Sequence, residues 1–122
     1  MKSLLLVAHG SRVATSNDSV AALTDRLRPR LQSFGFETIT HAFLELTAPS
    51  IPDGIRDLVS AGSNEVVVLP YFLAPGTHVI DDIPELMNEA REAYPAVSFT
   101  VMPHLGGVDG MVDLILETAA EA

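Results

Sequence analysis

The sequence contains no cysteine, few basic residues and no long apolar run. Without thiols the chain can form neither a disulfide scaffold nor a thiolate metal site, and this composition favours the reducing cytosol. Only 7 lysine and arginine residues face 16 acidic ones, and the net charge of −9 argues against binding nucleic acid. His9 and Arg12 interrupt the first apolar stretch too early for a membrane span or a signal peptide. We therefore expect a cytoplasmic protein that binds neither nucleic acid nor a membrane.

The length and apolar content of the chain suit one small domain. Its 122 residues are 48% hydrophobic and 19% charged, which is enough to bury a core and leaves little length for a second unit. We expect residues 1–122 to form a single domain.

Apolar strands alternate four times with amphipathic helices, and this alternation indicates βαβ units around a parallel sheet. Right-handed crossovers between such units place helices on both faces. The sequence therefore predicts an α/β fold with a small, open, four-stranded parallel sheet. The strands are expected at residues 4–8, 37–44, 66–70 and 97–102.

The first two helices carry recognisable end signals. Ser16 or Asn17 can cap the first helix, and Pro29 should kink it or end it early. Ser50 should cap the second helix, which is expected to end at Gly62.

The last two helices are defined mainly by apolar spacing. The third is expected to start between Val79 and Pro84 and to end before Pro95. The last, from about residue 108 to 119, should bury three apolar side chains: Val112, Ile115 and Leu116.

Three potential metal ligands follow three successive strands. His9 comes directly after the first strand, Glu45 after the second and His78 after the third, about one βα unit apart. The carboxyl ends of parallel strands share one edge of the sheet, where ligands of such folds bind. Neutral imidazole and carboxylate together suit borderline divalent metals such as Co²⁺, Fe²⁺, Ni²⁺ and Zn²⁺. The sequence therefore predicts a metal site at this edge.

Structural interpretations of the same residues stay open. His9 can support its own turn, and His78 can belong to a turn that caps the next helix. Glu45 lies between two leucines and needs a partner, which could be Arg12 instead of a metal. The other two histidines are interpreted as structural or surface residues, the second being the better spare ligand because it too follows a strand: His41 and His104.

Three segments, at residues 5–12, 42–45 and 69–79, resemble the short-form sirohydrochlorin chelatases. These are class II chelatases of the CbiX and SirB type, lyases that insert cobalt or iron into a tetrapyrrole in cobalamin or sirohaem biosynthesis. The resemblance covers nearly the whole chain, and the third segment, continued by residues 82–84, is its most specific part.

The resemblance implies a reaction and roles for particular residues. His9 and His78 would bind the metal and take part in catalysis, with Glu45 assisting. The divalent metal, Co²⁺, Fe²⁺ or Ni²⁺, would be a substrate, and no organic cofactor is expected. An imidazole with a pKa of about 6.5 can hold the metal or accept a pyrrole proton. Contacts to the sirohydrochlorin-type tetrapyrrole are expected from three residues: Arg12, Phe72 and Leu73.

Larger class II chelatases resemble two such flavodoxin-like halves that face each other across a cleft. A homodimer of this chain would restore that cleft, and two-fold pairing is the commonest form of oligomer. We therefore expect a homodimer.

Two alternative functions remain. A protein that carries metal or tetrapyrrole without turnover would use the same ligands. The pair His9-Gly10 with Arg12 nearby also resembles the histidine phosphatases, but Ala8 stands where an arginine would precede the histidine, and cations to hold phosphate are scarce.

Overall fold

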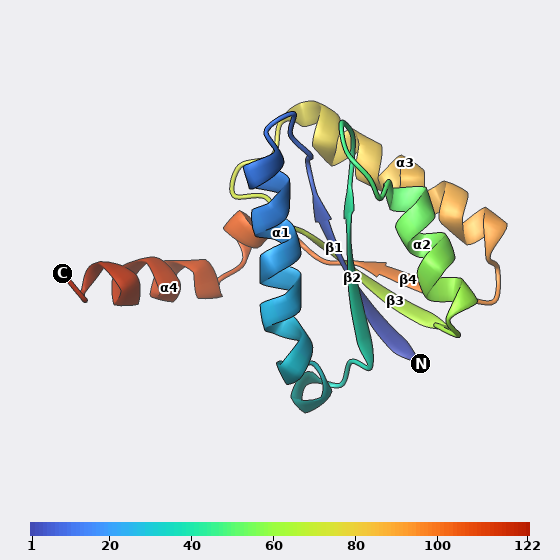
Figure 1. Cartoon of the computed structure of the whole chain (residues 1–122), viewed down its shortest axis with the longest axis horizontal. Coiled ribbons are helices and arrows are strands. Elements are labelled where there is room, and N and C mark those ends of the chain that lie inside the picture. Colours follow the sequence, from blue (N-terminus) through green and yellow to red (C-terminus); the bar gives the residue numbers. More distant parts are fainter.

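Four parallel strands form one open sheet at the centre of the structure, a computed structural model (Figure 1). It describes the backbone of residues 1–122 and all side chains except those of Thr77, His78 and Ile80. The strand order is β2-β1-β3-β4, which confirms the expected parallel sheet. The strands are β1 (Lys2–Ala8), β2 (Thr38–Phe43), β3 (Glu65–Pro70) and β4 (Ser98–Val101).

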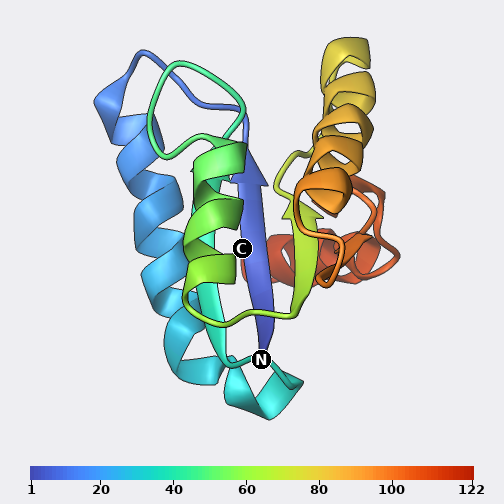
Figure 2. The same ribbon diagram turned by 90° about the vertical axis from the view of Figure 1, so that its right-hand side faces the viewer.

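Helices cover both faces of this sheet, as expected (Figures 1 and 2). One face packs against α1 (Ala14–Leu27), and the other packs against α2 (Ile51–Ser60) and α3 (Thr77–Ala93). None of the helices in the described chain is both long enough and apolar enough to span a membrane. The remaining elements are α4 (Gly110–Ala119) and three short 3₁₀ turns at Arg28–Arg30, Gln32–Phe34 and Leu105–Gly107.

The core is divided in two by β1, the central strand. Alternate side chains of a strand point to opposite faces, so Leu5 and Val7 pack towards α2 and α3, whereas Leu6 and Ala8 pack towards α1. Their side chains are almost completely buried. The α2 and α3 side holds the larger cluster, and it includes the fully buried Met87.

The first helix begins earlier than its capping residues predicted. It starts at Ala14, and Val13 precedes it without a side-chain cap. The prediction that Ser16 or Asn17 caps this helix was therefore wrong. The Asn17 amide instead bonds back to the loop, accepting from the Ser11 N–H at 2.9 Å and donating to the Ser11 carbonyl at 2.7 Å. The early end predicted at Pro29 is confirmed, because the chain tightens there into a 3₁₀ turn.

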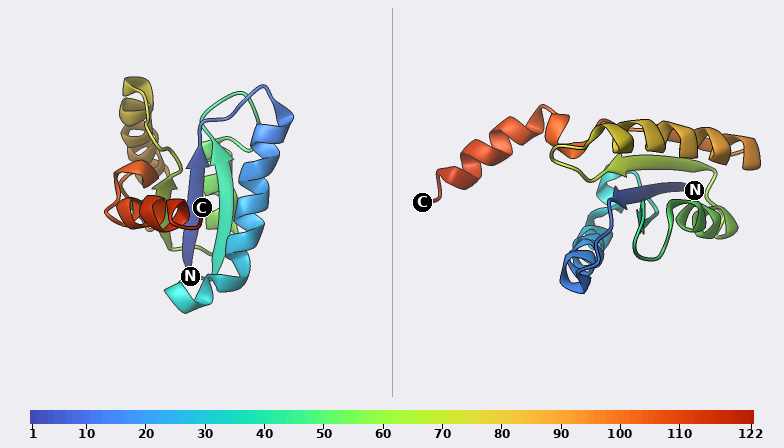
Figure 3. Two further views of the ribbon diagram at one scale, coloured as in Figure 1. Left: turned by 90° about the vertical axis from the view of Figure 1, so that its left-hand side faces the viewer. Right: turned by 90° about the horizontal axis from the view of Figure 1, so that it is seen from above.

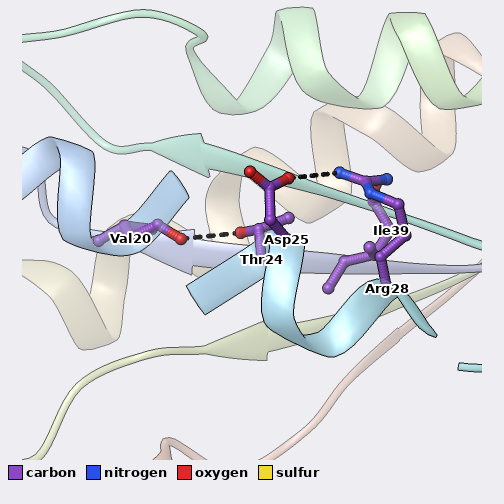
Figure 4. A network of polar contacts seen from close by, with 5 residues as sticks. All are labelled: Val20, Thr24, Asp25, Arg28 and Ile39. Atoms are coloured by element: carbon purple, nitrogen blue, oxygen red, sulfur yellow. Dashed lines mark hydrogen bonds and ion pairs between the residues drawn. The ribbon is translucent and has the colours of Figure 1, made fainter. Parts of the chain in front are cut away.

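Polar contacts fasten the end of α1 to β2 (Figure 4). The buried Thr24 hydroxyl donates to the Val20 carbonyl one turn earlier, at 2.9 Å. Arg28 forms an ion pair with Asp25 at 3.3 Å and donates to the Ile39 carbonyl of β2 at 3.1 Å. The bond from Arg28 to Ile39 therefore fixes the end of the helix to this edge strand.

The ends of α2 agree with the prediction, and the start of α3 does not. The Ser50 hydroxyl accepts from the Asp53 N–H at 3.2 Å, which confirms the predicted cap. In contrast, α3 begins at Thr77, two residues before the earliest predicted start, and Gly76 occupies its cap position. The predicted end before Pro95 is confirmed.

The last helix does not bury its apolar stripe, which corrects the prediction made from its spacing. Val112, Ile115 and Leu116 are 61%, 59% and 62% exposed. The helix extends away from the sheet on the α1 side and contacts chiefly the turn at Leu105–Gly107 (Figures 1 and 3). Apolar periodicity identifies the face of a helix that favours burial but not the surface that covers it.

Protonation of His41 is predicted to weaken the fold. Burial, with a smaller contribution from Arg28, lowers the pKa of His41 below its ordinary value of 6.5, and Asp25 opposes the shift. The ring also packs edge-on against Phe43. The unfolded chain therefore binds more protons at this site, so its contribution to stability is complete above about pH 6.5 and declines as the pH falls.

The variant His41→Gln should consequently lose less thermal stability than the wild type between about pH 7.5 and about pH 5.5. Melting followed by circular dichroism at a series of pH values measures this. Thr38→Gln, in the same strand, retains His41 and should keep the wild-type dependence. An equally steep decline in His41→Gln would contradict the prediction.

Candidate functional site

The loops that carry the candidate ligands leave the sheet at its topological switch point. The strands β1 and β3 are neighbours, with Val7 opposite Pro70, and the Tyr71 N–H extends this pairing by donating to the Val7 carbonyl at 2.7 Å. Beyond these ends the chain turns to α1 on one face and to α3 on the other (Figure 2). Such a divergence opens a crevice in which α/β proteins bind ligands.

His9 and Glu45 are brought together by the backbone. The Leu44 N–H donates to the Ala8 carbonyl at 3.0 Å, and the Glu45 N–H donates to the His9 carbonyl at 3.1 Å, so the two chains stay paired beyond their strands. The His9 Nε2 atom lies 3.5 Å from Glu45 Oε1. Both side chains are about half exposed, at 53% and 57%, so a ligand can reach them.

Gly10 makes this close pairing possible. Its φ of +94° lies in the left-handed region that favours glycine. A Cβ atom at this position would overlap the carbonyl oxygen of Glu45. The chain therefore turns directly after His9 while passing against the backbone of Glu45, and only glycine fits there.

Hydrogen bonding orients the His9 ring. Its Nδ1 atom lies 3.0 Å from the Gly10 carbonyl, which can only accept, so Nδ1 carries the proton of this bond. In the neutral ring Nε2 then presents a lone pair towards the Glu45 carboxylate. A nitrogen and an oxygen lone pair 3.5 Å apart can be shared by one cation. A metal-binding histidine usually donates its other ring N–H to a carboxylate, a backbone carbonyl or water, and the bond from His9 to the Gly10 carbonyl is of this kind.

The partner of Glu45 is thus His9. Arg12 is exposed and forms no ion pair with any side chain that the structure describes. The interpretation of Arg12 as the partner of Glu45 was wrong. Glu45 is also not buried: its backbone stays paired with His9, but its side chain is more than half exposed.

The third candidate ligand is placed only by its backbone. His78 lies in the first turn of α3, after the loop that leaves β3, and its side chain lies outside the described part of the structure. Among the described side chains, no three histidines or acids are close enough to hold a metal ion. His9 and Glu45 supply two donors, and the role of His78 stays a prediction.

An apolar groove lies beside the loop after β3. Phe72 lines it, whereas Leu73 is 70% exposed and contributes none of its lining. His104, interpreted from the sequence as a structural or surface residue, forms part of the groove wall. The lining residues are Pro70, Phe72, Pro75, Val79, Ile83, Pro84, Val101, Met102 and His104.

Two glycines bring His104 to this groove. The Gly106 N–H donates to the Phe72 carbonyl at 2.9 Å, and a Cβ on Gly106 would overlap the backbone of Leu73. The His104 ring lies directly against Gly107. The sequence contains the signal that could have indicated this contact, because adjacent glycines after a strand commonly mark a close backbone approach.

The two helices that begin at the switch point contribute positive potential. Val13 before α1 and Gly76 before α3 provide no side-chain cap for the N–H groups of the first turn. Uncapped helix starts attract anions, so this edge can receive carboxylates although the protein is acidic overall.

Together, the fold and this site define an open α/β protein with an imidazole–carboxylate pair at the switch point of its sheet. The CbiX family model matches residues 3–122. The chain therefore belongs to the CbiX family.

Relatives and solved structures agree with this assignment. A sirohydrochlorin cobaltochelatase of Methanococcus maripaludis is 34% identical over 72% of this chain and 59% of its own length. A chloroplastic sirohydrochlorin ferrochelatase of Arabidopsis thaliana is 32% identical over 92% of this chain and 48% of its own. The crystal structure of the sirohydrochlorin chelatase SirB from Bacillus subtilis in complex with cobalt has a TM-score of 0.82 and 26% identity, covering 98% of this chain and 50% of SirB.

The chain spans between 44% and 59% of the length of three of the curated relatives it matches, and 93% and 94% of two others.

Replacing Gly10 is predicted to separate His9 from Glu45. Gly10→Ala should cost about 1–2 kcal/mol for the left-handed backbone, and a further loss should follow from displacement of the Glu45 loop. Gly35→Ala is a matched control because Gly35 also has a positive φ, of +85°, but has open space around it.

Thermal denaturation and Co²⁺ titration by calorimetry measure the two effects. Both variants should be destabilised, and only Gly10→Ala should also bind Co²⁺ more weakly. Equal Co²⁺ affinity in the two variants would show that the contact with Glu45 does not organise the site.

Proposed function

We propose that this protein is a sirohydrochlorin chelatase that inserts Co²⁺ or Fe²⁺ into the tetrapyrrole. The observation that carries the proposal is the His9–Glu45 pair, which presents nitrogen and oxygen lone pairs to one exposed point of the sheet edge. Relatives bear the names cobaltochelatase and ferrochelatase, and the SirB structures contain cobalt or Fe³⁺. Imidazole and carboxylate accept both metals, so the cellular supply selects between them.

Insertion exchanges one dication for two protons. As the metal enters, two pyrrole N–H bonds break, the macrocycle's nitrogens bind the metal, and two protons leave. His9, held by the Gly10 carbonyl, would offer Nε2 first to the metal and then, once the metal has moved to the macrocycle, to a proton. Glu45 would share the metal and accept the second proton or carry it to solvent. His78 would complete the ligand set from the opposite side of the switch point.

The tetrapyrrole would lie across the edge between the loops after β1 and β3. Its apolar face would rest against Phe72 and Leu73, beside the apolar groove. Arg12 and the uncapped starts of α1 and α3 would receive its carboxylates. This arrangement accommodates an anionic substrate in a protein whose net charge is −9.

The proposal extends to the domain organisation, location and pairing of the protein. Residues 1–122 would act as one chelatase domain in the cytoplasm, without an organic cofactor. Pairing of two copies as a homodimer would supply a second wall to this edge, where the His9 and Glu45 side chains are about half exposed.

Loss of metal insertion in site variants tests the proposal. Anaerobic absorbance of sirohydrochlorin mixed with Co²⁺ or Fe²⁺ should show many turnovers per protein molecule. His9→Ala and His78→Ala should each lower the rate by roughly 100-fold or more, the range expected when a positioned acid–base group is lost, and Glu45→Gln by less.

Glu37→Gln is the control for Glu45→Gln, because Glu37 is an exposed carboxylate beyond the opposite end of β2. Its rate should equal that of the wild type. Binding of metal and tetrapyrrole without faster insertion would indicate a carrier and overturn the catalytic proposal.

Arg12 is predicted to act in substrate binding alone. Arg12→Ala should raise the KM for sirohydrochlorin by roughly 10-fold, the value of one charge-assisted hydrogen bond, with little change in kcat. Arg26 is also an exposed arginine, but it lies in the last turn of α1, so Arg26→Ala should leave the KM unchanged. A lower kcat at unchanged KM would place Arg12 in the chemical step instead.

A further inference from the structure

The loop between β3 and α3 is held to the rest of the sheet by two backbone bonds at its start. The Tyr71 N–H donates to the Val7 carbonyl of β1 at 2.7 Å, and the Phe72 carbonyl accepts from the Gly106 N–H at 2.9 Å. In the described part of the chain, no backbone hydrogen bond joins residues 73–76 to another segment. The direction in which the loop leaves for α3 is therefore set at these two bonds.

At Leu73 the loop is held by backbone contact and not by packing of the side chain. The Leu73 side chain is 70% exposed. Its backbone lies against Gly106, where a Cβ atom would overlap the Leu73 carbonyl oxygen and come within 2.7 Å of the Leu73 Cα atom. The φ of Gly106 lies outside the left-handed region, so the approach of Leu73 is what requires glycine at this position.

The turn at Leu105–Gly107 is itself fixed to the sheet, and it lies beside the loop that leads from β3 to α3 (Figure 1). The Met102 N–H donates to the Val68 carbonyl at 2.9 Å and extends the pairing of β4 with β3 beyond the end of β4. The Gly107 N–H donates to the His104 carbonyl at 3.0 Å and closes the turn. The middle of the turn therefore meets the loop after β3 from a fixed position.

Gly10 and Gly106 have corresponding positions at the carboxyl edge of the sheet. Among the described contacts of the chain's eight glycines, only these two would place a Cβ atom on the backbone of another loop. Gly10 meets the loop that carries Glu45, and Gly106 meets the loop that leads to His78. The two close approaches thus occur in the loops that carry the candidate ligands.

We infer that Gly106 is a positioning residue for metal insertion, because it sets where α3 starts and so where His78 is delivered relative to His9 and Glu45. This role rests on the ligand function proposed for His78. Donors that share one metal ion must converge on one point, so a loop that leaves the sheet at another angle withdraws its donor. A displacement of about 1 Å in a reacting group can lower a rate by about 100-fold.

Gly106→Ala tests this role, with Gly110→Ala as the matched control. Gly110 has open space around it and a φ outside the left-handed region, so its variant should insert metal at the wild-type rate. Gly106→Ala should lower the rate by roughly 10- to 100-fold. In a His78→Ala background it should lower the rate no further, because the residue on which it acts is gone. A wild-type rate for Gly106→Ala, or a full additional loss in the His78→Ala background, would overturn the inference.

The visible absorption spectrum of bound Co²⁺ separates positioning from a loss of stability alone. The spectrum responds to the number and arrangement of the metal's ligands. With Gly106→Ala it should therefore resemble the spectrum obtained with His78→Ala. A wild-type spectrum together with a lower melting temperature would show that Gly106 supports only the turn, and this result would contradict the role.

Hydrogen exchange of the wild-type protein gives a measurement that does not depend on the folding of a variant. Coupling between two sites is reciprocal, so if Gly106 fixes His78, a metal ion bound to His78 strengthens the bond from the Gly106 N–H in return. Exchange of this amide, followed by NMR, should slow by about 5-fold or more with saturating Zn²⁺ in the wild type but not in His78→Ala. Equal exchange with and without bound Zn²⁺ in the wild type would refute the inference.

The His78→Ala variant distinguishes failure of this inference from failure of the proposed function. If His78→Ala inserts metal at the wild-type rate, the ligand role proposed for His78 fails, and the role of Gly106 fails with it. If His78→Ala is impaired and Gly106→Ala is not, only the role of Gly106 is overturned.

Discussion

The site depends on the pairing of β1 with a strand on each side. Hydrogen bonds to the Ala8 and His9 carbonyls hold the loop after β2, and a bond to the Val7 carbonyl holds the loop after β3. His9 and Glu45 therefore emerge from chain segments whose relative positions are fixed by backbone bonds, not by flexible side-chain contacts. Gly10 lets the loop after β1 turn against the backbone of the loop after β2. A ligand geometry set by the ladder is rigid, which lowers the cost of ordering donors around a metal.

Local patterns predicted the sheet, the order of the helices and the place of His9, Glu45 and His78 after successive strands, because a buried parallel strand is a short apolar run. They failed where the outcome depends on tertiary contacts. The position of Asn17 suggested a helix cap, but its side-chain amide forms hydrogen bonds with the Ser11 backbone instead. The leucine neighbours of Glu45 indicated burial, but its side chain is more than half exposed. The stripe on α4 identified an apolar face without identifying its cover.

The exposure of the site matches the chemistry proposed for it. A chelatase must receive a metal, release it to a large flat macrocycle and then let the product leave. Donors buried in a closed cage would hold the ion, and thiolates would hold it more firmly still. Half-exposed imidazole and carboxylate groups at a crevice bind more weakly, and the positive helix starts near them would guide the proposed anionic substrate past a negatively charged surface.

The central position of β1 also sets an order of events during folding. This strand precedes both of its partners in the chain, so it cannot join a sheet until residues 38–43 and then 65–70 are available. Parallel pairs close long loops before they gain hydrogen bonds, and such contacts form slowly. Until then the apolar segment Leu4–Ala8 is unprotected on both edges, and a newly made chain is most prone to aggregate in that interval.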